Sequence, residues 1–526
     1  MDQTASITDQ RTTTTICWRI GSSLLVALAL LAIGLWNLSS PPLWWDEGWT
    51  LSVARNWVER GHYGRLLGGD LAPPGLEAAF PVTASVALSF RLFGIGIWQG
   101  RLVGVLFMAA ALFLMYYLAS RLYNRQVAVG TLFVLLFMSM HPDLHPLING
   151  RQVLAELPMF FYLLGGYTCF LFVLHGSLWF MPVAVTFWGV ALITKAQVLP
   201  FWTISLLVPL GITLYERKWN IAAFLTTALL GSFILCRLLI VMQQILLRNH
   251  TLPRTQVHGM YDITALVPAL FNRLYAVKIT LIFGVPTLLG LGYAAWRLIK
   301  DEHPEPSTDI KTVRLALLAL TGSWFAWYLA LSVGVPRYLF PVTFFGSMFV
   351  AALLYDLTDH FSLSSTIKRG GHALRTRHFT LQSTVALLTT LAVAWSVRIN
   401  LVTLYRYYAI YADTSALRVA DFLNTQTSTK SLVETYDSEL FFLVDRRFHY
   451  PPDQLHVELN RRSLLGRDVT VGYDPLAKDP DYLVVGPFGR LWHLYDPVLA
   501  KGVFRLLRSY NNSYYNINYD IYERVR

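Results

Sequence analysis

Residues 20–49, IGSSLLVALALLAIGLWNLSSPPLWWDEGW, decide how this chain is organised. Residues 20–38 are almost entirely apolar, and a helix needs about 20 apolar residues to cross the hydrocarbon of a bilayer. No convincing small-residue cleavage site follows, so the run predicts a retained membrane helix rather than a removed signal sequence. Directly after it come two prolines, three tryptophans and the adjacent acids Asp46 and Glu47, where the helix leaves the membrane.

The composition of the whole chain agrees with a membrane protein. Of its 526 residues, 54% are hydrophobic and only 14% are charged, whereas a soluble domain carries about a quarter charged residues. The net charge of +11 does not indicate nucleic acid, because much of it lies in short loops where Lys and Arg hold those loops in the cytoplasm. The three cysteines fall in or beside apolar segments, so no disulfide framework is predicted.

Further apolar runs predict a polytopic helical protein with about eleven transmembrane helices. After 20–38 they are 102–120, 127–145, 153–174, 177–194, 196–214, 219–240, 279–296, 315–333, 338–356 and 380–398. Residues 76–90 are also apolar, but the run is short and contains Glu77 and Pro81. We interpret it as a surface helix in the first outer loop rather than a span.

The distribution of basic residues supports this topology. With the N-terminus inside and 76–90 left out, the main inner loops are all basic, as the positive-inside rule requires. They contain Arg121 and Arg125, Arg217 and Lys218, Arg297–Arg314, and Lys368–Arg377. Counting 76–90 as a span would move these loops to the outside.

The chain therefore divides into three predicted regions. Residues 1–17 form a cytoplasmic tail, 18–402 form the transmembrane domain with its first outer loop at 39–100, and 403–526 form an extracytoplasmic domain. The last region is long enough to fold separately. We predict a small α/β domain, with a helix at 415–423 and strands at 431–436, 441–445, 482–486 and 514–522.

The acid pair Asp46 and Glu47 is the first candidate site. An acceptor hydroxyl or amine must lose its proton as it attacks a sugar, and a carboxylate can take that proton. A position at the bilayer surface suits a lipid-linked donor, whose reacting carbon stands just above the buried tail. The structural alternative is an aromatic belt of Trp44, Trp45 and Trp49 that anchors the helix end while both acids face water.

A second outer loop, 141–152, leads to Arg151 and then Glu156. An ionisable group at the edge of a span is costly unless it pairs or faces a wet cavity. Their spacing of five does not stack them on one helix face, but they can pair if the helix begins between them. The alternative is a structural ion pair that holds the loop. His141 and His145 each precede a proline, which disfavours a regular ligand-bearing helix, and no metal site is predicted.

Arg337 and Tyr338 lie at the outer mouth between two late spans. A guanidinium presents a fork of donors that matches phosphate oxygens; the alternative is that Arg337 snorkels to lipid headgroups. Four more cations occupy similar outer positions, and together they would suit an anionic lipid headgroup: Lys195, Arg151, Arg101 and Arg237.

The order of these features resembles the bacterial members of the protein O-mannosyltransferase and aminoarabinose transferase superfamily, the GT-C glycosyltransferases. Members show an Asp-Glu pair after the first span, a Pro-Pro surface helix ending in Leu-Phe-Gly, Arg-Leu at the next span, an Arg followed by an acid, Thr-Lys, and Arg-Tyr near a Pro. The matching residues are Asp46-Glu47, Pro73-Pro74, Leu92-Phe93-Gly94, Arg101-Leu102, Arg151 with Glu156, Thr194-Lys195, and Arg337-Tyr338 with Pro341.

This resemblance implies a membrane glycosyltransferase that moves a sugar from a polyprenyl-phosphate donor, with inversion, to a lipid, glycan or protein acceptor. It implies no cofactor, no nucleic acid and a bacterial-type plasma membrane. The implied site has Asp46 as general base beside Glu47, the phosphate held by Arg337, Tyr338, Lys195, Arg151, Arg101 and Arg237, and support from Glu156, Glu77 and Trp45. The chain departs from the family at Ala72, where members often carry a basic residue or His, and Glu77 is expected to take a role there.

Two other classes remain open from the sequence. A lipid or solute transporter or flippase would place charged groups near the midplane, often in repeated halves, whereas this chain has no evident repeat and its ionisable residues crowd one face. An envelope assembly scaffold would use the extracytoplasmic domain as its binding module.

Overall fold

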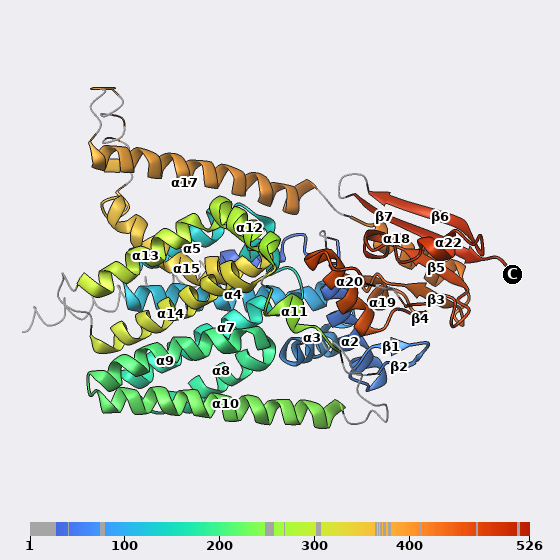
Figure 1. Ribbon diagram of the computed structural model, residues 1–526, viewed down its shortest axis with the longest axis horizontal. Coiled ribbons are helices and arrows are strands. Elements are labelled where there is room, and N and C mark those ends of the chain that lie inside the picture. Colours follow the sequence, from blue (N-terminus) through green and yellow to red (C-terminus); the bar gives the residue numbers. More distant parts are fainter. Residues whose placement is uncertain are drawn as a thin grey trace, which may run out of the picture.

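The computed structural model describes residues 28–39, 42–73, 79–247, 257–267, 269–300, 307–362, single positions between 365 and 376, and then 380–410, 413–469, 472–512 and 516–526. A bundle of long helices forms one part of the molecule, and a sheet domain caps one end of it (Figure 1). That end is called the sheet-domain end below.

Within the described residues, eight helices are long and apolar enough to cross a membrane, so the chain is a multi-pass membrane protein. The spans are α4 (Ile97–Leu122), α7 (Glu156–Leu174), α9 (Leu199–Tyr215), α10 (Trp219–Leu247), α12 and α13 (Leu270–Ile279 and Val285–Lys300), α14 (Thr308–Leu331), α15 (Pro336–Leu357) and α17 (Leu381–Tyr405). The predicted helical class is confirmed, and each of these helices coincides with a predicted run.

The other three predicted spans differ in length. Helix α5 (Arg125–Phe137) and helix α8 (Phe180–Thr194) are shorter apolar helices. The predicted run 127–145 was too long because Ser139, His141 and Pro142 interrupt it, and a short 3₁₀ turn and α6 (Pro146–Asn149) follow. Of the run 20–38, only 28–38 lies within the described residues, where 28–35 is helical.

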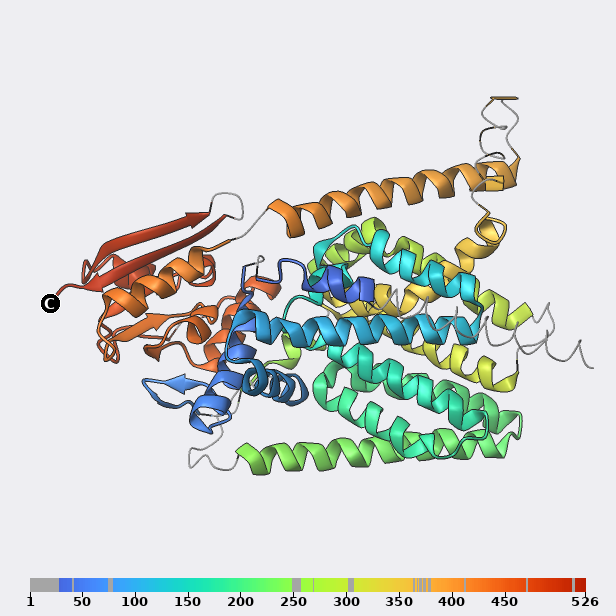
Figure 2. The ribbon, with the colours of Figure 1, turned by 180° about the vertical axis from the view of Figure 1, so that it is seen from behind.

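The first outer loop forms α2 (Trp45–Arg60) and α3 (Phe80–Phe93), which lie between the bundle and the sheet domain (Figure 2). Asp46 and Glu47 sit in the first turn of α2, where carboxylates interact favourably with the helix dipole. The helix ends at Gly61, whose φ of 72° suits a left-handed cap. Helix α3 packs on α2 and α4, and at about 21 Å it is too short to cross the hydrocarbon, as predicted for this run.

The C-terminal domain is built on a five-stranded sheet in the order β4-β3-β5-β7-β6. Its strands are β3 (Leu432–Thr435), β4 (Arg447–His449), β5 (Tyr482–Val485), β6 (Phe504–Asn512) and β7 (Ile517–Arg524), with β3 parallel to β4 and β5. Helices α18 (Ser415–Gln426), α19 (Glu439–Leu443), α20 (Asp453–Leu465), α21 (Pro487–Leu491) and α22 (Asp496–Leu499) surround it. The predicted small α/β domain is confirmed.

One strand prediction was wrong. Residues 441–445 belong mostly to helix α19, because a short apolar run does not distinguish a buried strand from a buried helix. The helix buries Leu440 and Phe442 and packs directly on α2. The predicted strands at 431–436, 482–486 and 514–522 are confirmed by β3, β5 and β7.

A close approach of backbones joins the two parts of the molecule. A Cβ added to Gly48 of α2 would overlap the backbone of Glu439 at the start of α19. The side chain of Ser438 also donates to the carbonyl oxygen of Trp45. Glycine at position 48 is therefore what lets the sheet domain dock on the helix that carries the acid pair.

We predict that Gly48→Ala lowers the stability of the docked protein by about 1–3 kcal/mol, because the new methyl group must push the α2 and α19 backbones apart. The measurement is the thermal midpoint of the purified protein in detergent. Gly211→Ala on α9, where an added Cβ meets nothing within 4 Å, is the matched control. An equal midpoint for both variants would contradict the predicted contact.

Candidate functional site

Four of the predicted site residues meet in one ion-paired cluster. Arg337 Nη1 lies 2.6 Å from Asp46 Oδ2, and Arg337 Nε lies 2.8 Å from Glu156 Oε1. Lys195 Nζ lies 2.7 Å from the same Glu156 oxygen. The cluster thus alternates two carboxylates with two cations, which is how charged groups are tolerated at the edge of a membrane-spanning bundle.

Helix ends bring these side chains together. Asp46 is in the first turn of α2 and Glu156 is the first residue of α7. Lys195 directly follows α8, and Arg337 is the second residue of α15. Because α7 and α15 start where α8 finishes, their termini lie at the same end of the bundle. The sequence-based expectation that these residues gather in one place is thus met geometrically.

The members of the cluster differ in access to solvent. The Asp46 side chain is 42% exposed, whereas that of Glu156 is only 3% exposed. Glu156 is held from two sides by cations and positions both of them, while Asp46 is the carboxylate that an incoming molecule can reach. Tyr338 follows Arg337 and lies within hydrogen-bonding reach of Gln197, just after Lys195.

The second member of the acid pair points elsewhere. Glu47 forms two hydrogen bonds with Arg101, at 2.7 and 2.8 Å, and both side chains are 0% exposed. Arg101 also donates to the carbonyl oxygens of Leu38 and Pro42. The predictions that Glu47 is catalytic and that Arg101 binds phosphate are not supported by this geometry, because the two groups are enclosed and satisfy each other. The contacts of Arg101 hold α4 against the start of α2 and against the segment that contains Leu38 and Pro42.

Two further predicted cations lie outside the cluster. Arg151 donates to the carbonyl oxygens of Trp36 and Asn37, and its guanidinium lies 4.1 Å from the centre of the Tyr408 ring. Its proposed pairing with Glu156 is replaced by the contacts that Glu156 makes with Arg337 and Lys195. Arg237 is exposed on α10, a helix packed on α8 and α9 at the edge of the bundle (Figure 1). Glu77 lies outside the described residues.

The sheet domain contributes residues that the sequence did not reveal. The Trp45 ring stacks on His456 of α20 at 4.5 Å between centroids and 10° between planes. Trp45 Nε1 donates to the carbonyl oxygen of Tyr436, and the Tyr436 hydroxyl is 2.6 Å from His456 Nδ1. Burial lowers the pKa of His456, and the Asp46 carboxylate acts in the opposite direction. Nothing in the local sequence pairs these residues, because they are hundreds of positions apart.

Arg65 packs against the ring of the neighbouring residue Trp49 on α2. The guanidinium of Arg65 lies 3.4 Å from the centre of the Trp49 ring and makes hydrogen bonds of 2.7 and 2.8 Å to Asp453 at the start of α20. Aromatic faces attract cations in this way. The contact ties α20 to the loop that follows α2.

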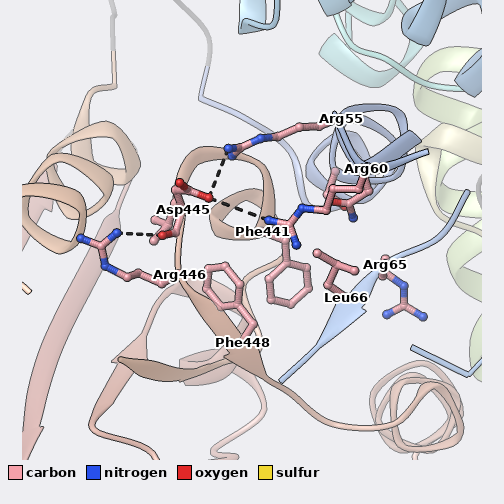
Figure 3. A pocket seen from close by; sticks show the side chains of 11 residues that line it. Arg55, Arg60, Arg65, Leu66, Phe441, Asp445, Arg446 and Phe448 are labelled. Atoms are coloured by element: carbon pink, nitrogen blue, oxygen red, sulfur yellow. Dashed lines mark hydrogen bonds and ion pairs between the residues drawn. The ribbon is translucent and has the colours of Figure 1, made fainter. Parts of the chain in front are cut away.

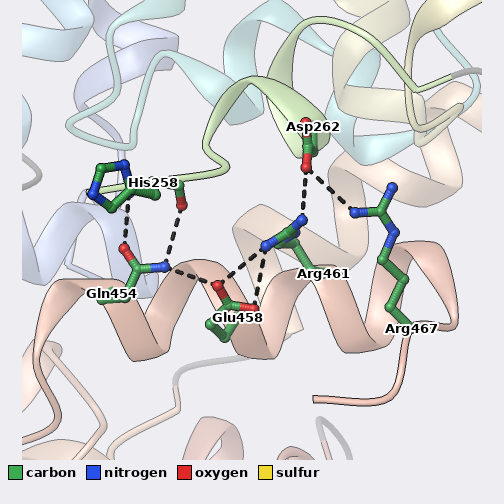
Figure 4. Close-up of polar contacts among 6 residues, drawn as sticks. All are labelled: His258, Asp262, Gln454, Glu458, Arg461 and Arg467. Carbon is green, nitrogen blue, oxygen red and sulfur yellow. Dashed lines mark hydrogen bonds and ion pairs between the residues drawn. The ribbon is translucent and has the colours of Figure 1, made fainter. Parts of the chain in front are cut away.

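Polar contacts also tie α20 to the loop between α10 and α12 (Figure 4). The His258 amide donates to Gln454, and the Asp262 carboxylate accepts from Arg461 at 2.8 Å and from Arg467 at 3.3 Å. Gln197, next to Lys195, donates to the carbonyl oxygen of Thr264 in the same loop. The helix α20 and this loop, which includes α11 (Tyr261–Thr264), therefore form one wall next to the ion-paired cluster.

Within the described part of the chain, no three His, Cys, Asp or Glu side chains are grouped as metal ligands. His145 contacts backbone atoms of Leu136 and Leu147 through its two ring nitrogens, so both nitrogens are engaged by the backbones of α5 and α6. The expectation that no cofactor takes part stays a prediction.

The arrangement of helices and the capping domain define a GT-C fold. No family model and no curated protein sequence matches the chain. Among solved structures, ArnT from Cupriavidus metallidurans bound to undecaprenyl phosphate aligns with a TM-score of 0.60 and 14% identity, over 95% of this chain and 97% of that one. Its apo state aligns with a TM-score of 0.57, also at 14% identity, over 97% and 98%.

A second group of neighbours shares the fold. The oligosaccharyltransferase of Archaeoglobus fulgidus in its apo form aligns with a TM-score of 0.51 and 12% identity, over 88% of this chain and 69% of that one. The alignments with ArnT confirm, at the level of the fold, the predicted resemblance to the aminoarabinose transferases.

We predict that Glu47→Gln destabilises the protein by about 3–5 kcal/mol, because it leaves the buried Arg101 guanidinium without its counter-charge. The thermal midpoint and the yield of folded protein should both fall. Asp46→Asn is the matched control. The Asp46 carboxylate is half exposed, so its loss leaves no enclosed charge unpaired. Normal stability of the Glu47 variant would refute the role of Glu47 in holding Arg101.

Two buried acids near Trp45, Asp437 and Glu439, are expected to make the stability of the folded protein depend on pH. Burial raises the pKa of Glu439 to about 8, and Asp437 adds to the rise through repulsion. The Tyr519 hydroxyl donates to Glu439. Because the folded state favours the protonated acid, its stabilising effect is present below the ordinary carboxyl pKa and is lost as the pH rises toward 8.

We therefore predict that the thermal midpoint of the wild type falls between pH 5 and pH 8, and that Glu439→Gln makes this fall shallower. Thermal unfolding of both proteins across that range measures the difference. Asp445→Asn, an exposed acid of the same domain, should leave the slope as in the wild type. Parallel pH profiles for the wild type and Glu439→Gln would show that Glu439 titrates normally.

Proposed function

We propose that the protein is a membrane glycosyltransferase that moves a sugar from a polyprenyl-phosphate donor to an acceptor outside the cytoplasm. The observation that carries the proposal is the cluster in which Arg337 joins Asp46 and Glu156 beside Lys195. A phosphate at the membrane surface needs such cations, and an attacking acceptor needs such a carboxylate. The GT-C fold, shared with ArnT in a structure bound to undecaprenyl phosphate, supports the same reaction class.

The proposed chemistry is a single displacement at the anomeric carbon. An acceptor oxygen or nitrogen forms a bond to that carbon while the bond to the donor phosphate oxygen breaks, and the configuration inverts. The polyprenyl phosphate leaves with the electron pair, and Arg337 and Lys195 neutralise the negative charge that builds on it. Asp46 accepts the proton from the acceptor.

The ion pair between Asp46 and Arg337 can be replaced by a contact between Arg337 and the donor phosphate. While this ion pair is intact, Arg337 holds the Asp46 carboxylate in place. A donor phosphate competes for the same guanidinium. Its arrival would release Asp46 toward the acceptor. Glu156, which is almost fully buried, continues to hold both cations during this exchange.

We infer the orientation from charge. With the basic loops in the cytoplasm, the N-terminus is cytoplasmic and the sheet-domain end faces outward. The donor enters from the bilayer, and a lipid, glycan or protein acceptor enters from the outer side, where His456 and Tyr436 adjoin Asp46. A transporter would need its charged groups along a path through the midplane, whereas the cluster described above occupies helix ends.

The test is transfer from a panel of polyprenyl-phosphate sugars by purified protein in lipid vesicles. We predict that the wild type consumes one donor and that Asp46→Asn lowers the rate about 10²–10⁴-fold, because general base catalysis is lost. The variant should keep its thermal midpoint. Asp356→Asn, at the opposite end of α15, is the control carboxylate and should keep normal transfer. Full activity of Asp46→Asn with the consumed donor would refute the proposed mechanism.

A further inference from the structure

A basic hollow lies where α2 meets the sheet domain (Figure 3). It is partly open to solvent and is lined by Arg55 and Arg60 of α2, Leu66 of β1 (Leu66–Leu67), and Phe441, Asp445 and Arg446 of the sheet domain. The hollow is distinct from the Asp46 cluster and takes no part in the transfer step described above.

The charges around the hollow do not balance. Asp445 is 70% exposed, and it faces Arg55 at 3.5 Å and Arg60 at a loose 4.0 Å. Arg55 has a second partner in Glu59. Arg446 instead directs its guanidinium to the carbonyl oxygens of Asp445, Asn424 and Thr427, which carry no net charge. Three guanidinium groups thus stand against two carboxylates, Asp445 and Glu59, so one positive charge is in excess.

One wall of the hollow is apolar. Leu66 and Phe441 are partly exposed there, and Phe448 packs edge-on against Phe441 at 5.1 Å between ring centroids. The guanidinium groups of Arg55 and Arg60 approach from the α2 side in Figure 3. An aromatic face next to a cluster of guanidinium groups suits a sugar ring that carries an oxyanion, because the ring packs on the aromatic face and the oxyanion replaces the weak Asp445 contacts.

The position of the hollow relates it to the transfer site. Arg55 and Arg60 follow Asp46 on the same helix by nine and fourteen residues, which corresponds to about 14 and 21 Å along the axis. Strand β1 and the sheet domain lie beyond the ends of the long helices (Figures 1 and 2). A group bound in the hollow thus stands away from the bilayer, about 14 to 21 Å from Asp46 along the axis of α2.

We propose that this hollow binds the phosphate or carboxylate of an acidic glycan acceptor, at a distance from the hydroxyl or amine that receives the new sugar. The assignment of this ligand to the acceptor rests on the proposed glycosyl transfer, whereas the binding of an acidic sugar does not. The charge of the acceptor would then select it, and Arg60 would be a specificity residue.

The experiment is calorimetric titration of the full-length protein in detergent with N-acetylglucosamine 1-phosphate, glucuronic acid and uncharged N-acetylglucosamine. The acidic sugars should bind and the neutral one should not. Arg60→Glu should weaken binding of both acidic sugars at least tenfold, because it replaces a cation with an anion. Arg60 is half exposed and makes a single long ion pair, so this change leaves the fold intact.

Two controls separate this inference from the proposed function. Arg505→Glu, an exposed arginine on β6 of the same domain, should bind the acidic sugars as the wild type does, and so should Asp46→Asn. Equal binding by wild type and Arg60→Glu would overturn the inference and leave the transfer reaction untouched. Loss of transfer in Asp46→Asn with unchanged binding would support both proposals separately.

A further arm identifies the source of the oxyanion. If the hollow instead takes the headgroup of a membrane lipid, Arg60→Glu would weaken binding of short-chain phosphatidylglycerol relative to short-chain phosphatidylcholine in the same detergent titration and would leave the sugar titrations unchanged. That outcome would overturn the acceptor assignment. The expected result is the reverse, with equal binding of the short-chain lipids by the wild type and Arg60→Glu.

Discussion

The interaction on which the rest of the structure depends is the double hold of Glu156 by Lys195 and Arg337. A carboxylate that is 3% exposed at the start of a membrane-spanning helix is tolerated only with its charge compensated. The two cations come from the end of α8 and the start of α15. Because this charge must be compensated, three helix ends lie together. The second side of the Arg337 guanidinium contacts Asp46 on α2. The cluster is therefore both a structural clasp and the proposed chemical centre.

The adjacent acids of α2 illustrate how helix geometry divides tasks. Successive residues on a helix point about 100° apart. Glu47 consequently turns into the protein and pairs with Arg101, while Asp46 turns toward the half-exposed cluster. Gly48, one position further, allows α19 to touch the helix backbone. Three consecutive residues thus anchor the helix, present the proposed base and dock the domain that adjoins it.

Much of the fold could be predicted from the sequence because lipid imposes a simple rule on composition and length. The apolar runs located the long helices, and the acids of the 20–49 stretch led to Asp46. The position of Lys195 and Arg337 at helix ends also followed from where the runs stop. The sequence did not reveal which partner each charged side chain contacts. Arg101 and Arg151 have the same residue type and similar positions, but they are enclosed by carbonyl oxygens or by Glu47, and a single sequence does not reveal what lies across the bundle.

The contribution of the sheet domain was also hidden from the sequence. His456 and Tyr436 reach Trp45 through tertiary packing alone, and the segment 441–445 formed a helix because its apolar residues pack against α2. These contacts link the sheet domain to the proposed centre.

The most direct test of the central claim is an electron cryomicroscopy structure of the protein with a polyprenyl-phosphate sugar bound. We expect the donor phosphate to lie within hydrogen-bonding distance, about 3 Å, of Arg337 and Lys195, and Asp46 to have moved off Arg337 toward the open side of the site. A phosphate bound elsewhere on the protein, with the Asp46–Arg337 pair undisturbed, would contradict that claim.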